Sequence, residues 1–158
     1  MILVCTGFHI PFVRLFQAAD DLAGRTGEDV LVQGRNEGGF NFRYARHAQS
    51  FDNWHELAQS ARVLVSHGGI MLAYALQARV PLVAVPRRRC YGEHCNDHQV
   101  EFSQWLADQY YFPIVMEMAE LPDAIERAVA EKTSQFLPHN RIQLERFLAE
   151  SLGLKKAK

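Results

Sequence analysis

Two short segments of this sequence carry residue types that could bind a phosphorylated ligand. Residues 66–69 read Ser-His-Gly-Gly and directly follow the apolar run 63–65. Residues 86–99 contain three consecutive arginines, then Gly-Glu-His and Asn-Asp-His-Gln. Glycines let a backbone approach a ligand closely, and guanidinium groups make charge-assisted hydrogen bonds to phosphate. Together the two segments predict a site for a nucleotide or a nucleotide-linked sugar.

The first segment allows a functional and a purely structural interpretation. If a helix begins after Gly69, its N-terminus favours an anion, and His67 would donate a hydrogen bond to a diphosphate. The same residues also suit a tight turn from a strand into a helix, in which the histidine side chain is hydrogen-bonded within the turn. Both interpretations stay open, because helix N-termini attract anions generically.

The second segment is open to two interpretations as well. The arginines at 87–89 could neutralise phosphates, or they could be a solvated run of charge. Asp97 and Gln99, at the start of an expected helix, could bind sugar hydroxyls as acceptor and as donor plus acceptor. Alternatively, Asn96 and Gln99 form a capping box, and Asp97 interacts favourably with the helix dipole.

Other catalytic or metal-binding arrangements find less support. His9 follows Gly7 in an early loop and could contact a phosphate or act as a general base, since histidine exchanges protons near neutral pH. Zinc would need the two cysteines and two histidines within residues 90–98, but they lack a paired C-x2-C arm. No G-x-S-x-G elbow, Walker loop or G-x-G-x-x-G fingerprint occurs in the sequence.

The totals are those of an ordinary globular protein. The chain has 158 residues, 48% hydrophobic and 22% charged, so one domain can bury a sizeable core. A formal net charge of −1 gives no general attraction to nucleic acid, and no nucleic-acid partner is expected. Three cysteines without a framework spacing favour a reducing, cytoplasmic location. No apolar run approaches the roughly 20 residues that span a bilayer, so any membrane association would come through a partner or the surface.

Apolar runs alternate with helical patterns along the chain. The expected strands are 2–5, 29–33, 42–45, 63–65, 81–85 and 112–116. The expected helices are 12–22, 54–61, 70–77, one from residue 96, one around 122–129 and one within 138–152. Asp52 is the expected N-cap of the second helix.

Because the strands are continuous apolar runs, they predict a parallel sheet that is covered on both faces. The predicted fold class is α/β, with a single Rossmann-like doubly wound parallel sheet in one domain over 1–158 and a basic tail at about 153–158. Such a sheet binds ligands beyond the carboxyl ends of its strands. The loops 6–11, 66–70 and 86–99 are therefore expected to form one site.

These motifs, in this order, resemble the C-terminal domain of glycosyltransferase family 28, over residue 1 to about residue 130. Residues 3–15 are similar to the family's opening strand and loop, and 65–69 match its Ser-His-x-Gly motif. Residues 85–88, 91–94 and 96–99 match its Pro-Arg, Gly-Glu-His and Asp-His-Gln elements. The resemblance is closer to small stand-alone members. These include the catalytic subunit of the two-part UDP-N-acetylglucosamine transferase acting on dolichol-linked chitobiose, and bacterial capsule and exopolysaccharide subunits.

The resemblance implies the donor-binding, C-terminal half of a GT-B enzyme, with the nucleotide sugar at the carboxyl edge of the sheet. Carried over by position, it assigns donor binding to Gly7, His67, Gly68, Gly69, Arg88, His94, Asp97 and Gln99. It leaves the general base as His9, Glu93 or a residue of a partner. Family 28 enzymes generally need no tightly bound metal, and neither a metal nor a cofactor is expected.

The implied reaction moves a sugar from a UDP-sugar to an acceptor hydroxyl in polysaccharide or glycolipid synthesis. It needs a base for the hydroxyl and charge stabilisation for the leaving diphosphate. A full GT-B enzyme has two domains, so the resemblance implies a membrane-anchored partner subunit that binds a lipid-linked glycan acceptor. The chain would then be a cytoplasmic catalytic subunit, active with this partner and peripheral to the membrane through it.

The sequence also departs from the family pattern. Where the family usually has a second glycine followed by Ser or Thr, this chain has Ile-Met-Leu at 70–72. Tyr74 stands where a ribose-binding Glu is often found. Either change could weaken the donor site or alter its donor. The alternative function is therefore a non-catalytic nucleotide-binding or interaction module derived from the same fold.

Overall fold

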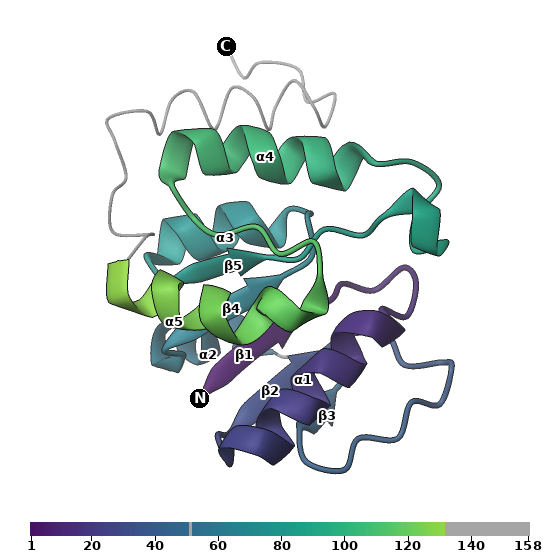
Figure 1. Ribbon diagram of the computed structural model, residues 1–158. Coiled ribbons are helices and arrows are strands. Elements are labelled where there is room, and N and C mark those ends of the chain that lie inside the picture. The colour runs from purple at the N-terminus through teal and green to yellow at the C-terminus, as the bar shows by residue number, and fades with distance from the viewer. Residues whose placement is uncertain (51, 132–158) are drawn as a thin grey trace.

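Five short parallel strands form the centre of the computed structural model, which describes residues 1–50 and 52–131 (Figure 1). They are β1 (Ile2–Cys5), β2 (Val30–Gln33), β3 (Arg46–Ala48), β4 (Val63–Ser66) and β5 (Leu82–Ala84). Their order in the sheet is β3-β2-β1-β4-β5. Ile2 lies beside Val30 on one side and Val63 on the other, so the strand order reverses next to β1. The expected α/β, doubly wound parallel sheet is confirmed.

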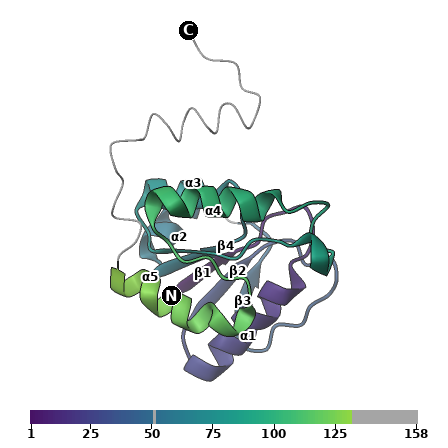
Figure 2. The same ribbon diagram turned by 45° about the horizontal axis from the view of Figure 1, so that its top comes forward.

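Helices cover both faces of this sheet (Figure 2). They are α1 (Val13–Thr26), α2 (Trp54–Ser60), α3 (Met71–Ala78), α4 (His98–Tyr110) and α5 (Leu121–Glu131). Two single turns of 3-10 helix are η1 (Arg89–Tyr91) and η2 (Met118–Glu120). Side chains of β1 alternate between the layers: Ile2 and Val4 pack with α1 and α5, whereas Leu3 and Cys5 pack with α2, α3 and α4. The expected helix within 138–152 and the basic tail lie outside the described residues.

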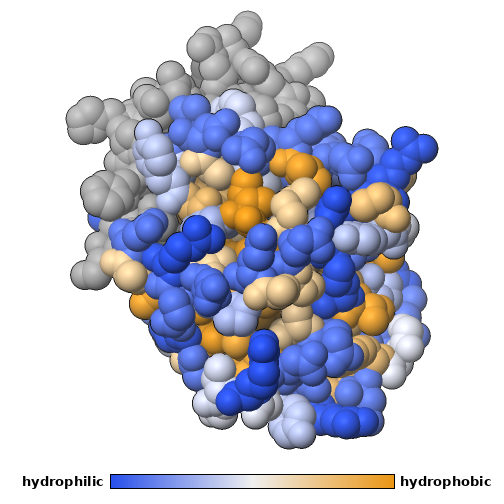
Figure 3. Space-filling model, in the orientation of Figure 1, coloured by the Kyte–Doolittle hydropathy of each residue, from blue (hydrophilic) through white to orange (hydrophobic). Residues whose placement is uncertain are grey.

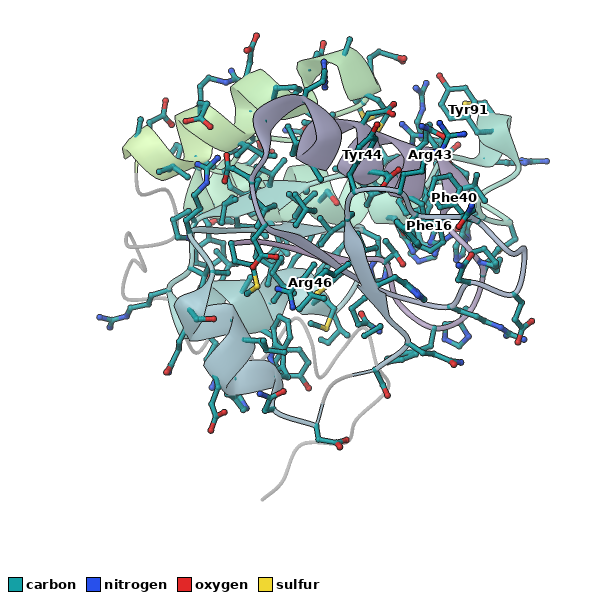
Figure 4. The ribbon with its side chains drawn as sticks, turned by 90° about the horizontal axis from the view of Figure 1, so that it is seen from below. Phe16, Phe40, Arg43, Tyr44, Arg46 and Tyr91 are labelled. Carbon is teal, nitrogen blue, oxygen red and sulfur yellow. The ribbon has the colours of Figure 1, made fainter. Side chains whose placement is uncertain are left out.

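The third strand begins later than the sequence predicts, at residue 46 instead of residue 42. The carboxylate of Asp20 on α1 accepts the backbone N–H groups of Arg43, Tyr44 and Ala45, at 2.8 to 3.1 Å. These donors are therefore unavailable to a strand ladder. Figure 4 shows Arg43 and Tyr44 beside α1, away from Arg46 at the start of β3. The prediction of a strand over 42–45 was wrong because this buried carboxylate bends the segment.

Two further local predictions fail. The segment 112–116 is no full strand: it contributes one parallel bridge, between Ile114 and Ala84. Pro113 has no N–H to extend the ladder, and β5 offers only three residues to pair with. Asp52 is not the N-cap of α2; Asn53 holds that position, without a side-chain hydrogen bond. Within the described residues, no helix combines the length and hydropathy needed to cross a membrane.

Candidate functional site

The loops that follow β1, β4 and β5 meet at the carboxyl edge of the sheet, at the right of Figure 1. Several hydrogen bonds join the first loop and its strand to the other loops. A guanidinium N–H of Arg87 donates to the Thr6 carbonyl at 2.8 Å, and the ring of His67 bonds to the Cys5 carbonyl. The expected clustering of the three loops is therefore present.

The imidazole of His67 lies between two glycines. A Cβ on Gly7 would be 2.9 Å from the Cε1 atom of His67, and a Cβ on Gly69 would be 2.5 Å from Nε2. Both distances are shorter than side-chain atoms can adopt, so the ring occupies space that any larger residue would need. Gly7 also has φ of 76°, a left-handed conformation that favours glycine. The two glycines are thus required by the histidine, whether or not a ligand binds.

The protonation of His67 follows from its surroundings. Its Nδ1 lies 3.2 Å from the Cys5 carbonyl, which can only accept, so the proton of the neutral ring is on Nδ1. Burial lowers the pKa of His67 to about 4; the Cys5 bond opposes this shift, while the nearby Arg87, His9 and His94 add to it. At neutral pH the Nε2 atom therefore carries a lone pair. A hydrogen bond from Nε2 to a diphosphate needs a second proton on the ring.

Because Gly68 has no side chain, α4 can pack closely against the turn between β4 and α3. A Cβ at this position would lie 2.5 Å from the Gln99 carbonyl oxygen and 2.6 Å from the Ser103 Oγ. The N-terminus of α3 has no side-chain cap. The turn thus combines close packing behind it with an uncapped helix end, and helix ends of this kind attract anions.

Three side chains of the predicted site, Glu93, Asp97 and Gln99, bond to the backbone of the segment that carries them. Each accepts an N–H from one of three consecutive arginines: Arg87 to Gln99 Oε1 (3.1 Å), Arg88 to Glu93 Oε2 (2.9 Å) and Arg89 to Asp97 Oδ1 (2.8 Å). The capping box expected for Gln99 does not form, because its amide oxygen is used in this way and α4 has Asp97 at its N-cap. These motif residues therefore shape the loop between β5 and α4.

Glu93 is the most strongly bonded of these side chains. Its carboxylate accepts from Arg14 at 2.7 Å (Nε to Oε1) and at 2.9 Å (Nη2 to Oε2), besides the Arg88 N–H. Only 10% of the side chain is exposed. Both oxygens are thus engaged, and Glu93 ties α1 to the loop after β5.

The arginines after β5 diverge. Arg88 extends toward Glu117, with an ion pair of 3.0 Å, and lies over the Tyr91 ring. Arg87, which sequence reasoning did not single out from its neighbours, is 3% exposed and points under the loop after β1. Burial lowers the pKa of Arg87 to about 10, with Glu93 acting in the opposite direction, so it stays charged at neutral pH. In the sequence, only the adjacent Pro86 distinguished Arg87 from the two arginines that follow it.

The other two histidines of the predicted site, His9 and His94, lie at the outer margin of the three loops. His9 is exposed in the loop after β1, and its carbonyl accepts a hydrogen bond from Arg35 at 3.1 Å. The rings of His94 and His98 lie 4.5 Å apart, and the Cys95 Sγ is 3.4 Å from His94 Nδ1. Burial, and then His98, lowers the pKa of His94. Among residues 1–50 and 52–131, no group of three or more His, Cys, Asp or Glu side chains is arranged to hold a metal ion.

A hollow of about 510 Å³ lies elsewhere, between α1 and the segment η2–α5. Its polar lining comes from Asp21, Arg25 and Tyr44. In Figure 3, which displays this side of the molecule, apolar surface occurs in patches interrupted by hydrophilic side chains. None of the predicted site residues contributes to this hollow.

Among the comparisons with known proteins, a family model shows the family and the similar solved structures show the fold. Residues 21–150 match the glycosyltransferase family 28 C-terminal domain. The structure is similar to spinosyn forosaminyltransferase SpnP (TM-score 0.60, 18% identity) and to the glycotransferase of kitacinnamycin (0.61, 16%). It is also similar to the glycosyltransferase SnogD from Streptomyces nogalater (0.51, 16%). These matches cover 84%, 85% and 87% of this chain but only 36%, 38% and 40% of those proteins. The search of curated proteins found no match.

Proposed function

We infer that this chain, which belongs to the family of glycosyltransferase family 28 C-terminal domains, is the donor-binding catalytic subunit of a two-component glycosyltransferase. It moves a sugar from a UDP-sugar to a lipid-linked acceptor in polysaccharide or glycolipid synthesis. The observation that carries this proposal is the meeting of three loops at the carboxyl edge of the sheet. In a doubly wound fold, that edge is where ligands bind.

In this proposal the diphosphate lies at the turn of His67, Gly68 and Gly69, against the uncapped N-terminus of α3. The uncapped helix end stabilises the leaving diphosphate, while the guanidinium of Arg87 donates to the carbonyls of the loop after β1. Gly7 lets the His67 ring lie beside the loop after β1, next to this turn. Arg88 lies at the outer margin, where its ion pair with Glu117 limits its reach.

The sugar lies over the start of α4. Asp97 is exposed and keeps one carboxylate oxygen beyond its bond to Arg89, so it binds a sugar hydroxyl. Gln99, which the resemblance also placed at the donor, is buried and supports the loop through its bond to Arg87. His94 lies at the same outer margin. The general base is His9, because it is exposed and on the loop that faces this edge. Glu93, which the resemblance also allowed as the base, supports the loop through its bonds to Arg14.

The acceptor is bound by a second domain. The chain spans about two fifths of the length of the similar transferases, which supports a missing half of this kind. We assign that half to a membrane-anchored partner subunit, which holds the chain at the cytoplasmic side of the membrane and binds the lipid-linked glycan.

A non-catalytic nucleotide-binding or interaction module is the second candidate. One observation favours it: Glu93, Asp97 and Gln99 each use an oxygen to accept a backbone N–H of the segment after β5, and Glu93 also binds Arg14. These residues would therefore be retained for folding even in a chain without turnover.

Calorimetric titration with UDP and UDP-N-acetylglucosamine tests the proposal. We expect binding by the wild-type chain and about tenfold weaker binding by His67→Ala, because removing the ring leaves a cavity between Gly7 and Gly69 and loosens the turn that holds the diphosphate. His55→Ala, on α2, is the control and binds like wild type. No heat at millimolar UDP would exclude donor binding. UDP binding without sugar transfer, even with membranes that contain the partner, favours the module.

A further inference from the structure

The loop between β1 and α1 is held by its backbone carbonyls. All but one of the carbonyl groups from residue 6 to residue 11 accept a hydrogen bond from one of two arginines. Arg87 donates through its guanidinium to Thr6 (2.8 Å), Ile10 (2.5 Å) and Pro11 (3.4 Å). Arg35 donates through its guanidinium to His9 (3.1 Å) and through its backbone N–H to Gly7 (3.2 Å). The conformation of this loop is therefore set by residues from the loops after β2 and β5.

Arg87 is an unusual buried cation. Within the described residues its guanidinium makes no ion pair; it bonds to carbonyl oxygens and lies 4.6 Å over the Phe12 ring. A buried charge is costly unless polar groups surround it. Here the carbonyl dipoles of the loop supply that environment. The loop and the guanidinium therefore depend on each other: neither keeps its hydrogen bonds if the other moves.

We propose that Arg87 is a positioning residue, which holds the loop of residues 6–11 in the conformation that presents His9 to the donor site. The role of His9 as base rests on the proposed function, whereas the holding of the loop does not. Lysine cannot substitute fully, because an ammonium lacks the planar fork that reaches three carbonyls and stacks on Phe12.

The family-matching motif acts through this arginine. Gln99 accepts the Arg87 backbone N–H, and Glu93 binds Arg14, which also donates to the Pro86 carbonyl at 3.3 Å. Both residues thus fix the backbone from which the Arg87 side chain extends. The contacts run from the motif after β5, through Arg87, to the loop that carries His9.

Arg87→Gln and Arg87→Lys test the proposal, with Arg89→Gln as the matched control. Arg89 is on the same loop, and its variant loses the same charge from an exposed side chain. Three quantities are measured: hydrogen exchange of the Arg35 amide, which donates to the Gly7 carbonyl of the loop, the Kd for UDP, and turnover of UDP-N-acetylglucosamine with the partner.

For Arg87→Gln we expect exchange of the Arg35 amide to rise about tenfold, since opening of the loop no longer breaks the guanidinium bonds. Turnover falls about 100-fold, as for a misplaced catalytic group, while the Kd for UDP changes by less than about threefold. Arg87→Lys recovers part of the turnover. Arg89→Gln stays within about twofold of wild type in exchange and turnover.

Unchanged exchange in Arg87→Gln overturns the proposal, as does a turnover loss equal to that of Arg89→Gln or a loss confined to UDP affinity. If Arg87→Gln does not fold, Arg87→Lys decides, because it keeps the charge and loses the planar fork that reaches three carbonyls. Faster exchange of the Arg35 amide in that variant supports the proposal, and unchanged exchange overturns it. If wild type binds no UDP but exchange still rises in Arg87→Gln, the holding role stands and the proposed function fails.

Discussion

The turn between β4 and α3 and the loop between β5 and α4 lie at the same edge of the sheet but are built in opposite ways. In the turn, glycines make room for a buried neutral imidazole, and the end of α3 has no side-chain cap. In the loop, charged and amide side chains satisfy the backbone of their own segment. The comparison teaches that a motif rich in polar side chains need not be the part that is free to bind. Backbone N–H groups that have no side-chain cap, in a segment of small residues, are the better candidates for binding a ligand.

Gly68→Ala gives the largest expected effect, because it forces a backbone and not a side chain to move. The new Cβ would lie 2.5 Å from the Gln99 carbonyl oxygen, so α4 must shift. We expect a loss of about 3 kcal/mol in the free energy of unfolding, measured by urea denaturation. Gly38→Ala, where a Cβ meets nothing within 4 Å, is the control. A loss no larger than that of the control would show that the turn is not tightly packed.

His67→Gln tests the buried imidazole through the pH dependence of stability. Burial lowers the pKa of His67 to about 4, from 6.5, so the unfolded chain binds this proton more readily than the folded chain. Stability from this group is complete above pH 6.5 and falls by up to about 3 kcal/mol as the pH drops toward 4. The variant should lack this decrease, measured by urea denaturation from pH 7 to pH 4. Equal slopes for the two proteins would contradict a buried neutral ring.

Glu93→Gln tests the loop, where side chains carry the structure. The amide loses the charge that binds Arg14 but keeps one acceptor oxygen, so we expect a loss of about 2 kcal/mol in the free energy of unfolding. Asp29→Asn is the control, because its pair with Arg46 is exposed and should contribute less than about 1 kcal/mol. Equal losses of unfolding free energy in the two variants would contradict a larger contribution from the Glu93–Arg14 pair.

Asp97→Asn has the smallest expected effect and separates structure from binding. The amide keeps an oxygen to accept the Arg89 N–H, so thermal stability should change little. If the second oxygen binds the sugar, affinity for UDP-N-acetylglucosamine should fall about tenfold while affinity for UDP stays the same. Parallel titrations with the two ligands measure this difference. An unchanged ratio would leave Asp97 with its loop role alone.

Local pattern predicted the buried strands well and the edge of the sheet poorly. Continuous apolar runs at 2–5 and 63–65 can satisfy both their side chains and their backbones only inside a parallel sheet. The segment 42–45 carries a weaker pattern, interrupted by Arg43, and Asp20, more than 20 residues away, accepts its N–H groups. No window of neighbouring residues contains that interaction.

The sequence by itself determined the sheet, the three loops at its carboxyl edge and the resemblance to the family, because these follow from local apolar runs and from motif order. The tertiary structure alone decided which side chains are free. Arg87 and Arg88 are identical neighbours, yet one is buried under the loop after β1 and the other pairs with Glu117 at the surface. Successive side chains of an extended backbone point to opposite sides, and only packing against the β1–α1 loop determines which one faces inward.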